Sequence, residues 1–251
     1  MTVSLADVQS GTRAAPPRIL VYGIEGVGKS TFASKFPNPI FIQTEDGLDN
    51  IDCAKFPVAR KFEDVIGALD ALIREKHEYS TVVIDSLDWL EALIWKMLCE
   101  REGVESIEQI GGGYAKGYVQ ALTHWRRVVE KLQTLRLDKG CAIVLTAHAK
   151  IEFHDDPETA KFQRFAPQLH RKAYSLLAQW VDVVFFATRS IGAARGEGGG
   201  GDRVLRALGT SQLAAKRRYE IADDLPMDAG VRRILFRSEV YSVPLRQILF
   251  R

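Results

Sequence analysis

Residues 23–30 read GIEGVGKS, which fits the pattern G-x-x-x-x-G-K-[ST] with Gly23, Gly28, Lys29 and Ser30 at its fixed positions. Glycines allow the backbone to curl so that several N–H groups point at one anion. In this pattern the lysine reaches the β- and γ-phosphates of a nucleotide, and the following hydroxyl ligates Mg²⁺. The stretch therefore predicts a phosphate-binding loop for ATP and Mg²⁺.

Each residue of the loop has an expected role. Lys29 should bind phosphate, Ser30 should ligate the metal, and Thr31 is placed for the α-phosphate. The full set of expected nucleotide-binding residues is Glu25, Gly26, Val27, Gly28, Lys29, Ser30 and Thr31.

The sequence on both sides of the loop supports this prediction. Residues 18–22, RILVY, form a short apolar run that predicts a buried strand leading into the loop. Residues 30–36 predict a helix that ends before Pro37. Strand, loop and helix in this order are the context that a genuine phosphate loop requires.

Composition limits the class of protein. A chain of 251 residues, 46% hydrophobic and 26% charged, is typical of one soluble globular domain. No apolar run approaches the ~20 residues that span a bilayer, and the N-terminus lacks the pattern of a secretory signal. The three cysteines have neither disulfide nor metal spacing. We therefore expect a protein of the cytoplasm, a reducing compartment, with no membrane partner.

Apolar runs of strand length alternate with helical periods along the chain. The expected strands lie at residues 18–22, 40–44, 81–84, 141–146 and 181–188. The expected helices lie at 30–36, 62–76, 87–101 and 168–180. A further long helix should bury Tyr118, Leu122, Trp125, Val129 and Leu132. The alternation predicts an α/β fold with a mostly parallel central sheet and helices on both faces.

The remaining segments predict connections and ends. Residues 150–167 are polar, have no clear period and contain two prolines, so they predict a loop. The glycine run at 196–201 predicts a flexible turn into a strand near 204–208, which would form a C-terminal β-hairpin. The expected division is a flexible lead-in at 1–16, an ATPase core at 17–226 and a C-terminal tail at 227–251.

Two acidic residues follow expected strands. Asp85 ends the strand at 81–84, where a carboxylate that orients Mg²⁺ belongs. The next residue is Ser86, whereas many AAA+ motors carry a catalytic glutamate there, which disfavours that subclass. Glu45 follows the strand at 40–44, and ligands of parallel sheets bind at the carboxyl ends of strands. Glu45 could therefore activate water, or it is a solvated turn residue.

Four segments occur in the order found in one known family. They are GIEGVGKST at 23–31, FIQTEDGLD at 41–49, VVIDSLDWL at 82–90 and VLTAHAK at 144–150. Together they resemble the RecA-type recombinase core in its minimal phage form, over about residues 17–226. The resemblance implies a RecA-like P-loop NTPase fold and ATP hydrolysis.

The resemblance also implies roles at individual positions. Glu45 would be the hydrolytic base, and Asp85 would hold Mg²⁺ together with Ser30. The polar groups that end the fourth strand, Thr146 and His148, would sense the γ-phosphate. Histidine replaces the glutamine typical of RecA at this position, although histidine occurs in helicase relatives. A lone histidine at the end of a strand is often structural, which is the alternative role for His148.

A basic segment at residues 214–226, AAKRRYEIADDLP, resembles the Lys-x-Arg finger of RecA-like and hexameric-helicase ATPases. That resemblance implies that Lys216 and Arg218, or Arg217 in another register, enter the active site of a neighbouring subunit. It therefore implies a homo-oligomer, either a ring or a filament. The alternative is a basic surface cluster.

Two segments correspond by position to the loops with which RecA-like cores bind single-stranded DNA, at about 103–117 and 150–172. The basic candidates for DNA contact are Lys116, Lys150, Arg164, Arg171 and Lys172. Aromatic residues lie among them, and a single strand is bound by cations along its backbone and by rings that stack on its bases. Residues 203–251 carry ten Lys or Arg against five Asp or Glu, which also suggests contact with phosphates. Ordinary loops and a solvated surface are the alternatives.

The sequence and the resemblance together predict an ATP-hydrolysing RecA-like protein that acts on single-stranded DNA in homologous recombination or annealing. The resemblance alone implies that a phage or prophage encodes it and that it acts in the bacterial cytoplasm. A single-strand-binding protein is a further candidate partner. Three other functions stay open: a nucleotide or small-molecule kinase, a helicase loader or remodelling ATPase, and a non-enzymatic nucleotide-dependent scaffold.

Overall fold

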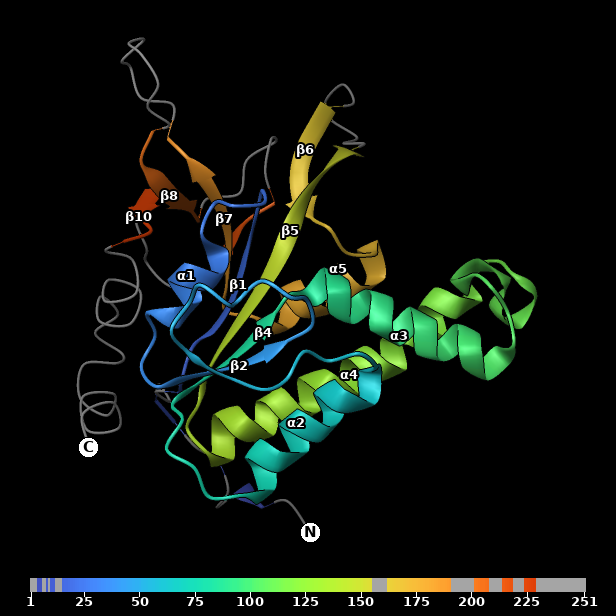
Figure 1. The fold of residues 1–251 in the computed structure, drawn as a ribbon, viewed down its shortest axis with the longest axis horizontal. Coiled ribbons are helices and arrows are strands. Elements are labelled where there is room, and N and C mark those ends of the chain that lie inside the picture. Colours follow the sequence, from blue (N-terminus) through green and yellow to red (C-terminus); the bar gives the residue numbers. More distant parts are fainter. Residues whose placement is uncertain are drawn as a thin grey trace.

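The computed structural model describes residues 4, 5, 8, 10, 11, 15–154, 162–190, 201–207, 214–218 and 224–228. Within them ten strands join into one sheet, in the order β10-β8-β7-β1-β5-β4-β2-β3, with β6 added to β5 and β9 added to β7 (Figure 1). The strands are β1 Arg18–Gly23, β2 Pro39–Gln43, β3 Ala54–Lys55, β4 Thr81–Asp85, β5 Ala142–His154, β6 Phe162–Pro167, β7 Val183–Arg189, β8 Arg203–Arg206, β9 Lys216–Arg217 and β10 Asp224–Pro226. The helices are α1 Lys29–Ser34, α2 Phe62–Arg74, α3 Leu87–Glu102, the 3-10 helix η2 Ile107–Gly112, α4 Lys116–Asp138 and α5 Arg171–Trp180.

The central strands run parallel. β1 pairs in parallel with β5 and β7, and β4 pairs in parallel with β5 and β2. Two antiparallel pairs lie at one edge, where β8 joins β7 and β10 joins β8. β6 and β9 also pair antiparallel, with β5 and β7. The predicted α/β class, with a mostly parallel sheet and a C-terminal antiparallel pair, is confirmed. Most of the expected turn at 196–201 lies outside the described residues.

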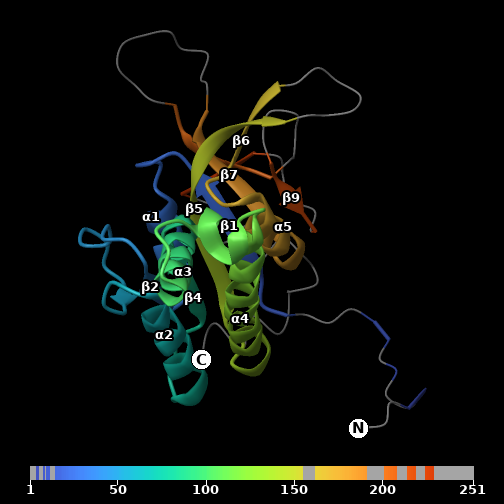
Figure 2. The same cartoon turned by 90° about the vertical axis from the view of Figure 1, so that its right-hand side faces the viewer.

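Both faces of the sheet are covered. Figure 1 shows α1 on one side of β1 and α2, α3 and α4 on the other, and Figure 2 shows α3 and α4 in front of the sheet. One core packs the sheet against α2 to α5, around side chains such as Leu69, Leu90 and Trp125. The second core joins Phe32 of α1 to Leu205 of β8. Because both faces are covered, the central strands are continuously apolar.

The amphipathic helices bury the expected faces with one shift. On α2 the apolar residue Ile73 is only half-buried, and the other apolar residues at helical spacing are buried, namely Phe62, Val65, Ile66, Leu69 and Leu72. On α4 the residues Trp125 and Leu132 are buried as predicted, but Tyr118, Leu122 and Val129 are only half-buried. Their places are taken by Ala121, Val128 and Leu135. The true stripe on α4 is therefore displaced around the helix by about one position.

The predicted loop at residues 150–167 is wrong. β5 continues through His154, and β6 returns antiparallel to it, so the two strands form a hairpin that extends beyond the rest of the sheet (Figure 1). Glu152 lies directly opposite Arg164, and their side chains form an ion pair of 2.9 Å. Opposite charges in facing positions stabilise antiparallel strands. Residues 155–161 are outside the described part.

The chain stays packed past the expected boundary at residue 226. Met227 is buried in the core on the α1 side, and Asp228 forms an ion pair with Lys35. The remaining tail, 229–251, and most of the expected lead-in at 1–16 are not among the described residues. Within the described part, no helix is both long and apolar enough to cross a bilayer.

Substitution of two helical glycines by alanine should have opposite effects on the free energy of unfolding. A Cβ at the exposed Gly67 of α2 meets no atom within 4 Å, so Gly67→Ala should raise the free energy of unfolding by about 0.5–1 kcal/mol. A Cβ at Gly117 of α4 would lie 2.1 Å from the backbone oxygen of Ile107. Gly117→Ala should therefore lower the free energy of unfolding by about 1–3 kcal/mol. Urea unfolding of both variants measures this, and equal signs would contradict the packing of η2 on α4.

Candidate nucleotide site

The phosphate loop joins β1 to α1 and has the conformation that its glycines permit. Gly26 has a φ of 70° and Gly28 a φ of 99°, which side-chain-bearing residues rarely adopt. Val27 lies between them and is buried in the core on the α1 side, so it anchors the loop. Glu25 and Thr31 are exposed, and Ser30 is half-buried at the start of α1. The residues predicted to bind nucleotide therefore form a loop and the first turn of α1 that follows it.

Lys29 is buried beneath this turn. Its ammonium group donates to the carbonyl oxygens of Gly23 and Ile24, each at 3.2 Å. Burial lowers the pKa of Lys29, and four surrounding carboxylates oppose this change, first Asp85 and then Asp88, Glu45 and Glu25. The structure thus brings the loop lysine together with the two acidic residues predicted from the sequence.

Asp85 is the last residue of β4 and is buried next to β5. One of its carboxylate oxygens accepts a hydrogen bond from the hydroxyl of Thr146 on β5. Thr146, which was expected to sense phosphate, thus orients the carboxylate of Asp85 in this structure. The Asp85–Ser86 peptide bond is cis.

Glu45 is held near Asp85 by hydrogen bonds of Thr44, the residue before Glu45, with Asp85 and with Ser86, the residue after Asp85. The hydroxyl of Thr44 donates to the carbonyl oxygen of Ser86 at 2.6 Å and accepts from the Ser86 N–H at 2.8 Å. The N–H of Thr44 donates to the carbonyl oxygen of Asp85 at 2.8 Å. These bonds lock together the ends of β2 and β4. Burial raises the pKa of Glu45, and the charge of His148 acts against this rise.

His148 lies on β5 in register with Gly23, at the start of the phosphate loop. Its Nδ1 is 2.8 Å from one carboxylate oxygen of Asp88, and its backbone N–H donates to the other at 3.0 Å. The hydrogen bond to Asp88 raises the pKa of His148. Burial alone would raise the pKa of Asp88, but the bonds from His148 outweigh it and hold the pKa below its ordinary value.

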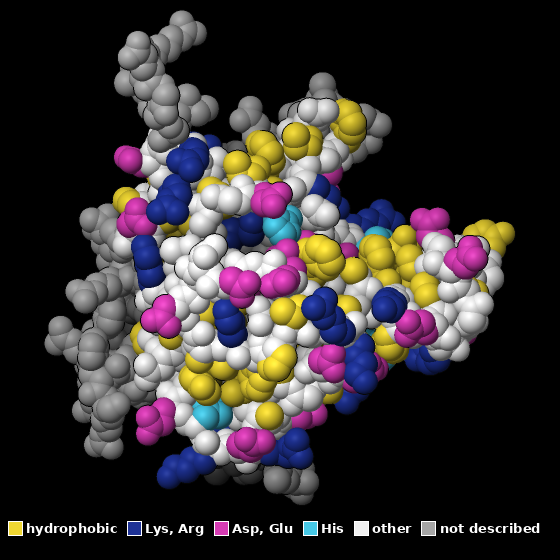
Figure 3. All heavy atoms as spheres, in the orientation of Figure 1, with side chains coloured by type: hydrophobic (Ala, Val, Ile, Leu, Met, Phe, Trp, Pro, Cys, Tyr) yellow, Lys and Arg dark blue, Asp and Glu magenta, His cyan; other side chains and the backbone are white. Residues whose placement is uncertain are grey.

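These residues fit a nucleotide with its magnesium ion. The described residues hold no group of three or more His, Cys, Asp or Glu side chains that could bind a metal by itself. Mg²⁺ typically takes one or two protein oxygens and completes its shell with phosphates and water. Ser30 and Asp85 would supply that number of oxygens. Figure 3 shows acidic side chains beside a histidine in the middle of this face.

Comparison with known proteins places the chain in a family. A family model described as an AAA domain matches residues 15–219. The chain belongs to this AAA domain family. It is therefore a P-loop ATPase by family. Ser86 after Asp85 disfavoured the AAA+ motors in the sequence, but this serine is compatible with membership of the AAA domain family. In this AAA domain Glu45, shortly after β2, belongs to the same group of carboxylates around Lys29 as Asp85.

Individual relatives are distant. The AAA domain is 23% identical over 135 residues to the SPbeta prophage-derived uncharacterized protein YorG of Bacillus subtilis strain 168. The match covers 52% of this chain but only 40% of that protein. Among solved structures, the RadB recombinase has a TM-score of 0.47 at 12% identity, with 83% of this chain and 85% of that chain covered. The flagellar accessory protein FlaH from Methanocaldococcus jannaschii has a TM-score of 0.42 at 10% identity, with 84% of each chain covered. Both scores lie below 0.5, so neither likeness bears on function.

Lys216 and Arg218 lie at the other end of the sheet from the phosphate loop. β9 pairs with Val183 and Val184 at the start of β7, whereas Gly23 of the loop pairs with Ala187 near its end. Lys216 donates to three carbonyl oxygens at the end of α5, those of Ala178 at 2.5 Å, Val181 at 3.0 Å and Gln179 at 3.3 Å. Arg218 donates to Gln179 at 2.7 Å and to the carboxylate of Asp182 at 3.3 Å. The two residues are therefore not brought to the nucleotide loop of their own chain.

The predicted DNA residues of the AAA domain separate into two places. Lys116, the first residue of α4, donates to the carbonyl oxygen of Gly111 in η2. The other four lie around the base of the β5–β6 hairpin and the start of α5. Arg164 and Arg171 line a pocket of about 480 Å³ there, together with Lys216. A neighbouring pocket of about 520 Å³ is lined by Arg171, Lys172 and the unpredicted Arg126 of α4.

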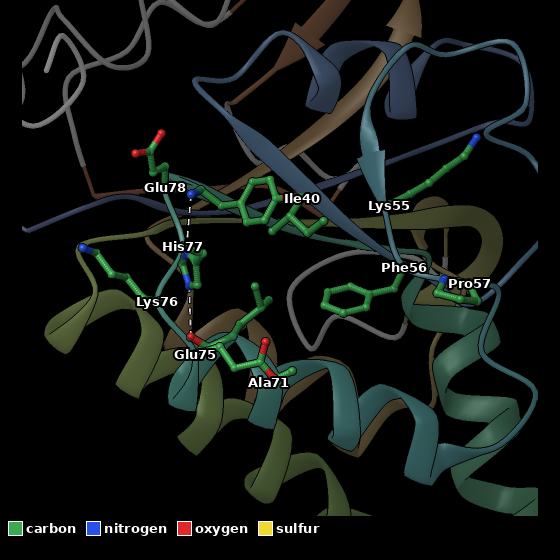
Figure 4. Close-up of a pocket in the computed structure, with 11 residues that line it drawn as sticks. Ile40, Lys55, Phe56, Pro57, Ala71, Glu75, Lys76, His77 and Glu78 are labelled. Atoms are coloured by element: carbon green, nitrogen blue, oxygen red, sulfur yellow. Dashed lines mark hydrogen bonds between the residues drawn. The ribbon is translucent and has the colours of Figure 1, made fainter.

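A further pocket of about 640 Å³ lies away from the nucleotide loop, between the start of β2 and the end of α2. Figure 4 shows the ring of Phe56 facing this space across from His77, with Lys55 and Lys76 directed outward. His77 is fixed by a contact of 2.9 Å to the carbonyl oxygen of Leu72 and by the N–H of Tyr79. Because Glu45 follows the opposite end of β2, this pocket is separate from the candidate site.

Sequence reasoning missed Asp88 and Thr44. Asp88 lies three residues after Asp85, in the first turn of α3, where a carboxylate can reach the end of a neighbouring strand. Thr44 precedes Glu45 and has no motif of its own. An acidic residue in the first turn of the helix that follows β4, and a threonine before a candidate base, were the available signals.

The pair of His148 and Asp88 predicts a pH-dependent contribution to stability. The raised pKa of His148 means that its contribution is complete below about pH 6.5 and is lost as the pH rises through the folded-state pKa. The lowered pKa of Asp88 means that its contribution is present above about pH 3.9 and is lost as the pH falls through the folded-state pKa. Asp88→Asn should therefore lower the pKa of His148, as measured by NMR titration of the histidine rings. His124, whose pKa burial lowers, is the internal control. An unchanged pKa of His148 would show that the pair does not form in solution.

Proposed function

We propose that this chain is a Mg²⁺-dependent ATPase of RecA-like type that acts on single-stranded DNA in homologous recombination or annealing. The observation that carries the proposal is the meeting of Lys29, Glu45, Asp85 and His148 at the carboxyl edge of the parallel sheet. Four separate elements supply these side chains, and each was expected at this place for nucleotide hydrolysis.

The chemistry follows from the positions of the groups. The loop N–H groups and Lys29 bind the phosphates, and Glu45 orients a water molecule and accepts its proton. A carboxylate with a raised pKa is a stronger base than a solvated one, and burial gives Glu45 that property. The bound Mg²⁺, held by Ser30 and Asp85, would neutralise charge on the phosphates. His148, fixed by Asp88, faces the same loop and is placed to respond to the terminal phosphate.

The β5–β6 hairpin supports an action on single-stranded nucleic acid. It exposes Ile151 and Phe153, whose side chains are 62% and 76% accessible. Figure 3 shows hydrophobic side chains gathered along this projection. Exposed rings next to cations are typical of proteins that bind single strands. β5 carries both His148 and this hairpin, so one strand connects the nucleotide to the proposed DNA surface.

The basic pockets along α5 supply the cations. Arg171 lines both pockets, and Arg164, Lys172 and Arg126 lie on either side of it. Arg164 is partly neutralised by Glu152, so Arg171 and Lys172 are the stronger candidates for phosphate contact. Lys150 donates to the carbonyl oxygen of Leu169 at the base of the hairpin, so its ammonium group is partly engaged within the chain.

Assembly and setting are part of the same proposal. Lys216 and Arg218 would act on the nucleotide of an adjacent subunit in a ring or filament. To do so they must leave the carbonyl oxygens of α5 and Asp182, at a net cost of about 0.5–1.5 kcal/mol for each hydrogen bond. The prophage origin of the YorG relative supports a phage setting. A helicase loader is the second candidate, because exposed Ile151 and Phe153 also fit an apolar protein partner.

Glu45→Gln tests the assigned base. The variant should lower the rate of ATP hydrolysis by about 10²–10⁴-fold while leaving nucleotide affinity intact, since a general base contributes that much to the chemical step. Steady-state hydrolysis with Mg²⁺ and nucleotide titration measure the two quantities. Asp46→Asn, which changes the exposed neighbour of Glu45, is the matched control. An unchanged hydrolysis rate in Glu45→Gln would favour a nucleotide-dependent scaffold.

Phe153→Ala tests the DNA surface. Single-stranded DNA should raise the hydrolysis rate of the natural protein severalfold at low salt, and Phe153→Ala should remove most of that increase without changing the basal rate. A lost stacking contact is worth ~1–3 kcal/mol. Leu137→Ala, another exposed apolar position at the end of α4, should behave like the natural protein.

The same assay separates the rival functions. Hydrolysis that is indifferent to single-stranded DNA in the natural protein would contradict the proposal. Stimulation by a helicase instead would then identify a loader, and phosphate transfer to a small acceptor would identify a kinase.

A further inference from the structure

Arg203 lies against the phosphate loop although it is 175 positions from Gly28 in the sequence. It is the first residue of β8, which pairs with the end of β7 at the carboxyl edge of the sheet. Its guanidinium Nη1 is 2.7 Å from the point where a Cβ of Gly28 would be. Because Gly28 has no side chain, the guanidinium group reaches the backbone of the loop that is built to hold phosphates.

The chain holds Arg203 in this place from two sides. Its second guanidinium nitrogen is 3.4 Å from the carboxylate of Asp228, which also binds Lys35 after α1 at 2.8 Å. Its backbone carbonyl accepts the N–H of Met227 at 2.9 Å, and Met227 and Leu205 are buried in the core on the α1 side. The position of Arg203 is therefore set by the packing of β8 and β10 on α1.

The charge balance of the site favours a further cation beside Lys29 and the expected Mg²⁺. Lys29 is surrounded by the carboxylates of Asp85, Asp88, Glu45 and Glu25, which together exceed its charge. A nucleoside triphosphate adds several negative charges to the same place. Arg203 approaches the loop at Gly28, and its own carboxylate partner, Asp228, is largely exposed.

We propose that Arg203 is a nucleotide-binding residue that acts within its own chain. Its guanidinium group donates to phosphate oxygens of a nucleoside di- or triphosphate on the loop, and Asp228 and Lys35 position it. Arginine suits this role because its planar group can donate two parallel hydrogen bonds to a phosphate. The inference deepens the proposed function, since it assumes that nucleotide binds at Lys29.

Equilibrium titration of the full chain with ADP and with a non-hydrolysable ATP analogue tests this inference. Arg203→Ala should weaken the affinity for both nucleotides by about tenfold or more, because a hydrogen bond to a charged group is lost. Arg203→Lys, which keeps the charge but not the forked geometry, should fall between Arg203→Ala and the natural protein.

Arg206→Ala is the matched control. Arg206 is on the same strand, has nearly the same exposure (34% against 35%) and also pairs with an aspartate of the last described segment, Asp224 at 3.5 Å. The affinity of the Arg206→Ala variant for nucleotide should equal that of the natural protein. Natural affinity in Arg203→Ala, or an equal loss in Arg206→Ala, would overturn the inference.

Lys29→Ala separates failure of this inference from failure of the proposed function. Loss of binding in Lys29→Ala with natural affinity in Arg203→Ala would overturn only the role of Arg203. Natural affinity in Lys29→Ala would show that nucleotide binds elsewhere, and both proposals would fall.

Discussion

The parallel pairing of β1, β5, β4 and β2 is the constraint on which the rest of the structure depends. Gly23 is in register with His148, and Gln43 is in register with Asp85, so the carboxyl ends of four strands meet at one edge. The strands have apolar cores on both faces, and a slip of one residue would exchange the two sets of side chains. The packing of the whole domain thus fixes the register, and the candidate site inherits its geometry from that register.

The electrostatics of the two ends of the sheet are different in kind. At the amino end, Arg18 pairs with the buried Asp182 at 2.5 Å and lowers the pKa of that carboxyl below its ordinary value despite burial. That pair is complete within the chain. At the carboxyl end, four carboxylates surround Lys29, the pKa of Glu45 is raised, and that of Lys29 is lowered. Groups whose pKa values are shifted against their charged forms are typical of sites that bind or react, which is why we place the function at this edge.

Local patterns were enough to predict the phosphate loop, the central strands and the acids at their ends. They failed where distant residues decide the structure. The β5–β6 hairpin was hidden because Glu152 and Arg164 are polar, and only their pairing across the strands makes them compatible with a sheet. Tyr118 was expected in the core, but its ring stacks on His170 at 4.0 Å, a residue of another element. Arg203 had no local signal at all, because its contact with Gly28 exists only after β8 has packed at the edge of the sheet.

Helix α3 links the two halves of the proposed function. Asp88 of α3 binds His148, which precedes the hairpin in the sequence. Glu91, one turn further along α3, accepts a hydrogen bond of 2.8 Å from the N–H of His170, which follows the hairpin in the sequence. Burial raises the pKa of Glu91 to about 7, so this carboxyl is costly to keep charged unless its hydrogen bond holds. Both ends of the segment that carries the hairpin are thus tied to one helix beside the candidate nucleotide site. A displacement of His148 by the terminal phosphate would move α3 or break the Asp88 bond, and either change would reach the hairpin without a flexible connection.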